Sequence, residues 1–169
     1  MSNDIEKANT PEKVKFRQSV LGLQDWMVQQ VEADPAKSIL KDCELAHFFT
    51  PIDSKYGCCA YARPFLMPQG SVVIGKIHKH QHLNFIMVGK VSVATEFGKK
   101  YFQAPCIFVS EAGLKRAVYA ETDVLWVTVH LTKYNTEADL DKIEDEIIAK
   151  NYEELGMITG DTHQIGEGK

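Results

Sequence analysis

Three histidines lie within five residues of one another in the stretch His78-Lys79-His80-Gln81-His82. Side chains at alternate positions of a β-strand point to the same face, so the three imidazole rings can turn the same way. Neutral imidazole is a common ligand of transition metals, and the ring can also hydrogen-bond to an anion. The stretch therefore predicts a site for a metal ion or an anionic molecule, provided that the surrounding strands form a pocket.

The segments at the two ends of the chain each predict a helix. Thr10-Pro11-Glu12 is typical of a helix start, because Thr caps the first turn and Pro fits the first helical position. An apolar stripe at helical spacing follows, made of Phe16, Val20, Leu23 and Met27. Asp34-Pro35 ends this helix. A second helix is predicted from Thr136 to about Lys150, and the glycine-rich tail that contains His163 is expected to be flexible.

Between the helices lie short runs rich in β-branched and aromatic residues, separated by turn signals. They are Gly57–Leu66, Val72–Ile77, Leu83–Val88, Val91–Phe97, Cys106–Val109, Lys115–Ala120 and Val124–Leu131. Short strands at such regular spacing indicate a sandwich or a small barrel. We therefore divide the chain into an N-terminal tail and helix (1–42), a β-barrel (43–132) and a C-terminal helix with its tail (133–169), together one structural domain.

The composition indicates a globular protein and argues against several functions. The 169 residues are 44% hydrophobic and 25% charged, which is ordinary for a soluble domain. With 19 basic against 23 acidic residues, the chain lacks the basic surface that non-specific nucleic-acid binding needs. It has neither an apolar run of the ~20 residues that span a bilayer nor a signal core, so neither membrane insertion nor secretion is expected. The cysteines are expected to be free thiols: Cys43, Cys58, Cys59 and Cys106.

The spacing of glycines and histidines in the centre of the chain resembles the first motif of the cupins, which are double-stranded β-helix barrels. The motif falls on Gly70, Lys76, His78, His82 and Gly89, so that Lys76 replaces its first histidine and His82 its glutamate. On a straight strand His78 and His82 would stand roughly 13 Å apart, too far to share one ion. The cupin fold turns the chain between these positions, which would let the two rings converge.

A second register of the same motif involves His80 and Asn84. Pairing His78 with His80 puts Asn84 at the glutamate position, but it brings the closing glycine too close, so the first register is preferred. His80 is then expected to face outward or to support the metal ligands from behind. Both His80 and Asn84 are candidates for contact with a bound ligand.

Arg116 stands where the second cupin motif has its metal-binding histidine. The matching positions are Glu111, Gly113, Arg116 and Ala120, of which only the glycine is retained. Arginine cannot bind a metal, but its planar fork suits a carboxylate or a phosphate. Arg116 is therefore either a clamp for an anion, assisted by Lys76, or the partner of Glu111 or another acid in a salt bridge.

Over most of its length the chain resembles small cupin proteins encoded by tailed bacteriophages. The similar stretches are Gly75–Asn84, Ala112–Ala120, Val124–His130 and Leu140–Ile148. This resemblance implies a mainly β, cupin-like double-stranded β-helix barrel with an N-terminal and a C-terminal flanking helix. It also implies a phage origin, but it implies no particular reaction.

The last predicted strand has two different faces. Trp126, Thr128 and His130 share one face, and Val127, Val129 and Leu131 share the other. The aliphatic face is expected to pack against a hydrophobic core. The mixed face could line the barrel mouth, with Trp126 as a pocket wall. It would then bring His130 towards His78 and His82. Three neutral imidazoles would suit one divalent transition metal such as zinc, iron, nickel, manganese or copper.

Three functions remain open from the sequence. In the first, the barrel binds a small anionic molecule through Lys76, Arg116 and the histidines, for example to sequester a host nucleotide or an immune signal. In the second, a metal on His78, His82 and His130 serves an enzyme whose Arg116 orients an acidic substrate. In the third, the barrel is a virion or assembly protein. Because cupins commonly pair through edge strands, a homodimer or larger homo-oligomer is expected, in the cytoplasm of the infected cell or on the virion.

Overall fold

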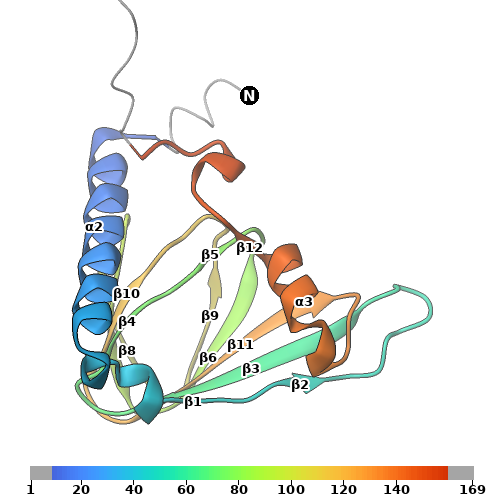
Figure 1. The fold of residues 1–169 in the computed structure, drawn as a ribbon. Coiled ribbons are helices and arrows are strands. Elements are labelled where there is room, and N and C mark those ends of the chain that lie inside the picture. Colours follow the sequence, from blue (N-terminus) through green and yellow to red (C-terminus); the bar gives the residue numbers. More distant parts are fainter. Residues whose placement is uncertain (1–8, 160–169) are drawn as a thin grey trace, which may run out of the picture.

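The computed structural model describes residues 9–159, in which two antiparallel sheets face each other between two helices (Figure 1). The predicted flexible tail with His163 lies outside the described residues. Within residues 9–159, no helix combines the length and the apolar character needed to cross a bilayer.

The larger sheet has six strands, in the order β1-β3-β11-β6-β9 with β2 also paired to β3. Its strands are β1 (Glu44–Leu45), β2 (Phe48–Phe49), β3 (Cys59–Met67), β6 (His82–Val88), β9 (Cys106–Ser110) and β11 (Val124–Thr132). The nine-residue β11 lies in the middle, where Thr128 is opposite Arg63 of β3 on one side and Asn84 of β6 on the other. Inward-facing side chains of these three strands therefore meet at one level of the barrel.

The smaller sheet has four strands, in the order β4-β10-β7-β8. They are β4 (Val72–Ile74), β7 (Lys90–Thr95), β8 (Gly98–Gln103) and β10 (Ala117–Ala120). A separate pair joins β5 (Ile77–His78) to β12 (Ile148–Ala149). Successive strands cross between the two main sheets in the order of a jelly roll, the topology shared by cupin barrels. This order confirms the predicted mainly β, cupin-like barrel.

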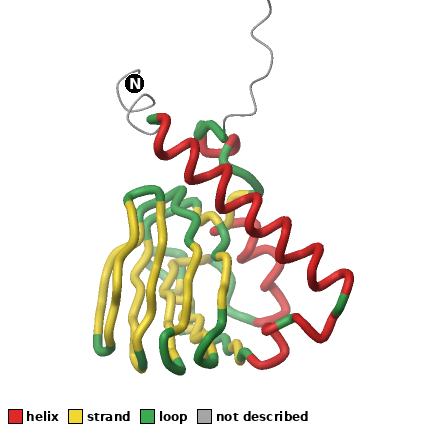
Figure 2. The backbone as a smooth tube through the Cα atoms, turned by 90° about the vertical axis from the view of Figure 1, so that its left-hand side faces the viewer, coloured by secondary structure: helices red, strands yellow, loops and turns green. Residues whose placement is uncertain are grey.

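The two predicted flanking helices are also confirmed. Helix α2 (Pro11–Ala33) runs along the outside of the sheet that contains β4, β8 and β10, and α3 (Leu140–Ile147) lies on the other side of the molecule (Figures 1 and 2). The four 3-10 turns are η1 (Pro35–Lys37), η2 (Ile39–Asp42), η3 (Glu137–Asp139) and η4 (Glu153–Leu155). A buried ion pair of 2.8 Å between Arg17 Nε and Glu96 Oε2 attaches α2 to the turn between β7 and β8.

Several strand predictions differ from the structure. Strands β1, β2 and β12 were not predicted, and β12 lies where the sequence predicted the end of the C-terminal helix, which stops at Ile147. The run Val72–Ile77 divides into β4 and β5, because the chain leaves the smaller sheet at Gly75, whose N–H donates to Arg116 O at 2.9 Å. Strand β8 was not predicted, since its sequence Gly-Lys-Lys-Tyr-Phe-Gln is mostly polar. It lies at the edge of its sheet, where charged residues are tolerated and protect against further pairing.

The interior between the sheets is apolar at one end and polar at the other. The apolar cluster contains Met67, Ile86, Val91, Val93, Val118, Ala120, Val124 and Trp126. The polar end contains the buried side chains of His78, His82, Asn84, Ser110, Arg116 and His130. Removal of the apolar cluster from water is the main source of stability, and it offsets the cost of burying the polar groups.

Candidate metal centre

His78, His82 and His130 converge at the polar end of the barrel. His78 ends β5 and His82 begins β6, so the chain turns between them instead of continuing as one strand. The ring centroids are 4.1 Å apart for His78 and His82, 4.9 Å for His78 and His130, and 4.5 Å for His82 and His130. One nitrogen of each ring lies within 4.8 Å of the others, which is close enough for a shared ion.

Backbone contacts hold the turn that brings two of these rings together. The N–H of Gly113 donates to His78 O at 2.8 Å, and that of Lys79 donates to Ile147 O at 2.8 Å. His130 reaches the same place from β11, because the mixed face of that strand turns inward. The ring of Tyr61 packs behind His130, with centroids 6.3 Å apart. All three histidines are therefore placed by the fold before any ligand binds.

Burial keeps these histidines neutral. Removal from water, together with the nearby His82, His130 and arginines, lowers the pKa of His78 to about 2. Burial also lowers the pKa of His130 to about 3 and that of His82 to about 4. A neutral imidazole keeps the lone pair that a metal requires.

Each of the three rings also has a nitrogen without a hydrogen-bond partner. These buried atoms are His78 Nδ1, His82 Nε2 and His130 Nε2. Buried polar atoms in proteins are almost always paired, so three such atoms in one cluster require an explanation. A transition-metal ion fits, because it binds neutral imidazole nitrogens and three ligands leave positions open.

Two arginines stand beside the histidines. Arg116 is only 8% exposed, and its guanidinium carbon is 6.0 Å from the centre of the Trp126 ring. Burial lowers the pKa of Arg116 to about 10. Among residues 9–159 no carboxylate pairs with Arg116, and Glu111 instead accepts a hydrogen bond from Gln81. The predicted alternative of a salt bridge to Glu111 is therefore not formed.

The second arginine, Arg63, was not among the predicted site residues. It lies on β3 opposite Thr128, whose buried hydroxyl oxygen also has no hydrogen-bond partner. Its charge adds to the effect of burial in lowering the pKa of His78 and His130. The register of β3 against β11 places Arg63 opposite Thr128. The alternation of side chains along β3 was the one sequence signal that could have indicated this position.

Asn84 and Trp126 face the interior, and their polar groups mainly bind each other. Trp126 Nε1 donates to Asn84 Oδ1 at 2.9 Å, and Asn84 Nδ2 donates to Ser110 Oγ at 2.8 Å. Asn84 is fully buried. These two residues therefore form a fixed wall of the site, while the buried atoms of the site without a hydrogen-bond partner belong to the three histidines and Thr128.

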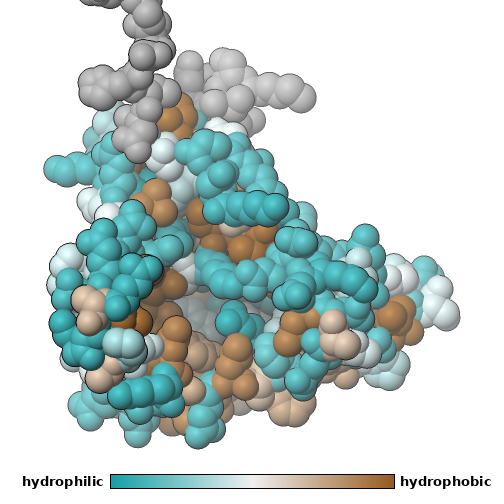
Figure 3. All heavy atoms as spheres, in the orientation of Figure 1, coloured by the Kyte–Doolittle hydropathy of each residue, from teal (hydrophilic) through white to brown (hydrophobic). Residues whose placement is uncertain are grey.

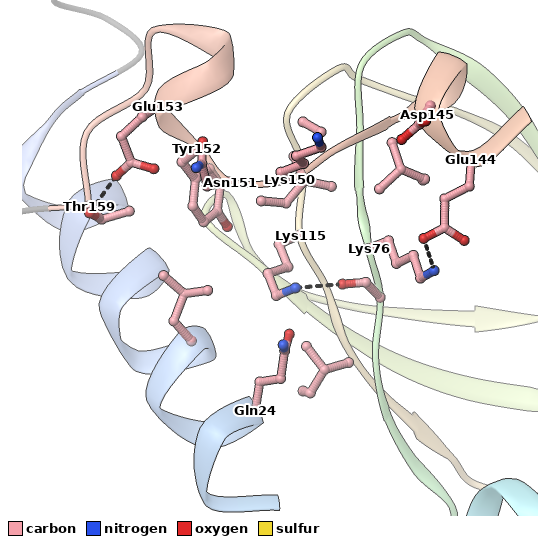
Figure 4. Close-up of a pocket in the computed structure, with 16 residues that line it drawn as sticks. Gln24, Lys76, Lys115, Glu144, Asp145, Lys150, Asn151, Tyr152, Glu153 and Thr159 are labelled. Carbon is pink, nitrogen blue, oxygen red and sulfur yellow. Dashed lines mark hydrogen bonds and ion pairs between the residues drawn. The ribbon is translucent and has the colours of Figure 1, made fainter. Parts of the chain in front are cut away.

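Lys76 and His80 lie outside the cluster. The Lys76 ammonium pairs with Glu144 of α3, and His80 is exposed in the turn between β5 and β6. Lys76 instead lines a separate pocket of about 550 Å³, into which Lys115 points and donates to Gly75 O at 3.0 Å (Figure 4). This face of the molecule is hollowed between α2 and α3 (Figure 3). Lys76 does not join Arg116, because it lies before β5, in the bend between β4 and β5, and its side chain turns to Glu144.

Comparison with known proteins assigns no reaction to this chain. No family model and no curated protein matches the sequence. Solved structures with a similar fold include ectoine synthase from P. lautus, at 13% identity and a TM-score of 0.46 over 60% of this chain and 72% of that one. A cupin superfamily protein from Desulfitobacterium hafniense has 11% identity and a TM-score of 0.41 over 52% and 77%.

An acetylacetone dioxygenase from Acinetobacter johnsonii is similar at the same level, with 15% identity and a TM-score of 0.40 over 53% of this chain and 62% of that one. These neighbours include enzymes with different names, and the similarities are too weak to assign the chemistry of any of them to this chain. What the barrel does has to be inferred from its own residues.

Proposed function

We propose that the barrel binds a small anionic molecule at a metal centre held by His78, His82 and His130. The observation that carries this proposal is the convergence of three buried, neutral imidazoles, each with an unpartnered nitrogen. A divalent metal such as zinc, iron, nickel or manganese would supply a Lewis acid with open positions for a ligand. The ligand would therefore bind between the histidines and the arginines.

The anionic character of the ligand is inferred from Arg116. A buried cation without a carboxylate partner is costly, and an incoming carboxylate or phosphate would neutralise it. The guanidinium fork can donate two parallel hydrogen bonds to either group, and Arg63 adds a second positive charge. Trp126 under Arg116 restricts its movement through a cation–π contact.

The resemblance to phage proteins gives this proposal a specific form. In an infected cell, a pocket that holds a phosphate-bearing host nucleotide or immune signal would act by sequestration and would need no turnover. A nucleotide phosphate matches both the arginines and a metal centre. We therefore choose nucleoside monophosphates as the first organic probes.

A metal-dependent enzyme is the second candidate, and the ligand count favours it. Three protein ligands with open positions are typical of catalytic rather than structural zinc sites. In such an enzyme Arg116 would orient the acidic group of the substrate, and Thr128 could hydrogen-bond close to the reacting atoms. Sequestration and catalysis use the same residues, so the fate of the ligand separates them.

The metal proposal is tested by elemental mass spectrometry of freshly purified full-length protein. We expect close to one transition-metal ion per chain in the wild type and loss of that ion in the His78→Ala/His82→Ala double variant. His80→Ala is the matched control, because His80 belongs to the same stretch but lies outside the cluster. Metal loss in the control alone, or no metal after reconstitution with zinc, iron, nickel or manganese, would contradict the proposal.

The anion proposal is tested by titrating inorganic phosphate while following Trp126 fluorescence in a Trp26→Phe background. Arg116→Gln should weaken binding at least about tenfold, the usual effect of a lost hydrogen bond to a charged group. Lys76→Gln is the control and should bind phosphate normally. AMP incubated with the metal-loaded protein should be recovered intact if the barrel sequesters its ligand, and chemically altered if it is an enzyme.

A further inference from the structure

A second cavity lies outside the barrel, between α2 and the chain that follows α3. Its volume is about 550 Å³, which is within the range of small-molecule sites, and Figure 4 shows the side chains that line it. Leu21 and Gln24 of α2 form one wall, and residues 148–153 form another. Neither the three histidines nor Arg116 is among the described residues that line this space, here called the α2 cavity. The α2 cavity is therefore separate from the metal centre.

Lys115 stands at the α2 cavity with its charge removed from water. The residue is only 7% exposed, and Figure 4 shows its side chain pointing into the cavity. Its neighbour Arg116 points the other way and lies over Trp126 inside the barrel. The backbone of Gly75 holds both residues, because its carbonyl accepts from Lys115 Nζ at 3.0 Å and its N–H donates to Arg116 O at 2.9 Å. The fold therefore places one cation in each of two separate sites.

The ammonium group of Lys115 has no anionic partner. No carboxylate of residues 9–159 forms an ion pair with it. Burial lowers the pKa of Lys115, and the charge of Asp25 opposes this effect while that of Lys76 adds to it. An ammonium group has three N–H donors, of which Gly75 takes one. An incoming carboxylate would accept from the others and would neutralise a charge that is costly to bury.

Tyr152 is a second buried polar group at the same cavity. It is 1% exposed, and its hydroxyl oxygen has no hydrogen-bond partner. Its ring belongs to the apolar cluster of Ile77 and Ala149, which fixes it in place. Buried hydroxyl groups are almost always paired, so this one also requires a partner. Two buried donors with unused capacity at one cavity indicate a ligand with acceptor oxygens.

The charges around the α2 cavity favour a singly charged ligand. Three lysines and three acids line it: Lys76, Lys115, Lys150, Glu144, Asp145 and Glu153. Lys76 is already paired with Glu144, so the lining has no excess of positive charge. A doubly charged phosphate is better matched to the metal centre, where Arg63 and Arg116 stand beside neutral histidines. A monocarboxylate matches the single unpaired ammonium of Lys115.

The rest of the lining favours an aliphatic chain on that ligand. Four aliphatic side chains line the cavity: Leu21, Ile74, Ile77 and Ile148. Each methylene group that leaves water for such a surface strengthens binding about threefold to fourfold. A carboxylate with a short hydrocarbon chain would therefore use both the polar and the apolar parts of the lining.

We infer that the α2 cavity binds a small aliphatic monocarboxylate, whose oxygens accept hydrogen bonds from Lys115 and Tyr152. Its chain lies against the aliphatic side chains of α2 and of the β5–β12 pair. The site uses neither the metal centre nor the arginines of the barrel. It can therefore hold or fail separately from the proposed function.

The test is isothermal titration calorimetry of full-length, metal-free protein with hexanoate. We expect one hexanoate per chain, bound at least about tenfold more weakly by Lys115→Met, which keeps the stem of the side chain and removes its charge. Tyr152→Phe should weaken binding about threefold, the usual effect of one neutral hydrogen bond. Hexanol, which lacks the charge, and acetate, which lacks the chain, should each bind at least about tenfold more weakly than hexanoate.

Arg116→Gln distinguishes the two sites, because it removes the neighbouring cation that faces the barrel. Hexanoate affinity should be the same in this variant as in the wild type. Affinity lost in Arg116→Gln and kept in Lys115→Met would place the carboxylate in the barrel and overturn the inference. So would hexanol that binds as tightly as hexanoate, or no binding of hexanoate at about 10 mM, a concentration above the usual range of specific affinities.

Circular dichroism shows whether each variant is folded. If Lys115→Met unfolds, Tyr152→Phe keeps the test decisive, because the Tyr152 hydroxyl has no partner in the protein whose loss could destabilise the fold. Unchanged hexanoate affinity in a folded Tyr152→Phe variant would then count against the site.

Discussion

Towards the polar end of the barrel, the two faces of the larger sheet differ in the opposite sense from most sheets. On β11 the inward residues are Trp126, Thr128 and His130, and the outward residues are Val127, Val129 and Leu131. The hydrophobic effect alone would bury the aliphatic face and expose the polar one. Here the polar residues are buried because three strands bring them to one site, and the aliphatic residues of β11 lie on its outward face, where Leu131 is 71% exposed.

The comparison also separates two kinds of burial cost. The inner face buries histidine nitrogens without hydrogen-bond partners and Arg116 without a carboxylate, a cost that a bound metal and anion would remove. The outer face exposes apolar surface to water, and this surface contributes little to the stability of the isolated chain.

The largest expected effect is that of pH on the inner face. In metal-free protein, burial lowers the pKa of His78 to about 2, of His130 to about 3 and of His82 to about 4. The unfolded chain binds protons on these residues below about pH 6.5, and the folded chain does not. Stability is therefore complete above pH 6.5 and is lost as pH falls towards 4, by about 1.4 kcal/mol per pH unit for each histidine.

Urea denaturation at pH 7, 6 and 5 in the presence of a chelator measures this loss. The slope of the unfolding free energy against pH should decrease in His82→Gln, because this variant removes one of the three buried titrating groups. An unchanged slope in that variant would mean that His82 is not buried in its neutral form.

The next effect compares one isoleucine from each face. Ile86 faces the core and is completely buried, whereas Ile107 is 65% exposed on the outward face of β9. Ile86→Ala should cost about 2–5 kcal/mol of unfolding free energy because it leaves a cavity. Ile107→Ala should cost less than about 0.5 kcal/mol. Equal losses in urea denaturation would show that the two faces are not distinguished in this way.

A smaller effect is expected from the polar wall of the site. Asn84→Leu leaves the indole N–H of Trp126 and the hydroxyl of Ser110 without their partner. The cost should be about 1–3 kcal/mol in urea denaturation, with a shift in Trp126 emission. The matched outward change, Leu83→Asn, should leave both quantities nearly unchanged, and a larger effect there than at Asn84 would contradict the assignment of the two faces.

The smallest effect is expected at Lys76, which pairs with Glu144 at the surface. Lys76→Ala should change the unfolding free energy by about 0–1 kcal/mol, as for other exposed ion pairs. Metal content and phosphate binding should not change, because Lys76 lies outside the cluster. A loss of phosphate affinity as large as that of Arg116→Gln would place Lys76 in the binding site after all.

The sequence by itself determined the class of fold and two of the three central residues. Turn signals and short β-prone runs indicated a barrel, and the histidine spacing pointed to His78 and His82, because both are local patterns along the chain. Strand alternation further placed His130 and Leu131 on opposite faces of one strand, although it could not say which of the two faces is inside.

Only the tertiary structure decided which groups meet. The division of Val72–Ile77 into two strands turns His78 towards His82 and leaves Lys76 outside, and the register of β3 against β11 adds Arg63. A register shift of one residue would reverse the direction of every side chain on a strand. The contents of the site depend on pairing between segments far apart in the chain, and no local pattern contains that information.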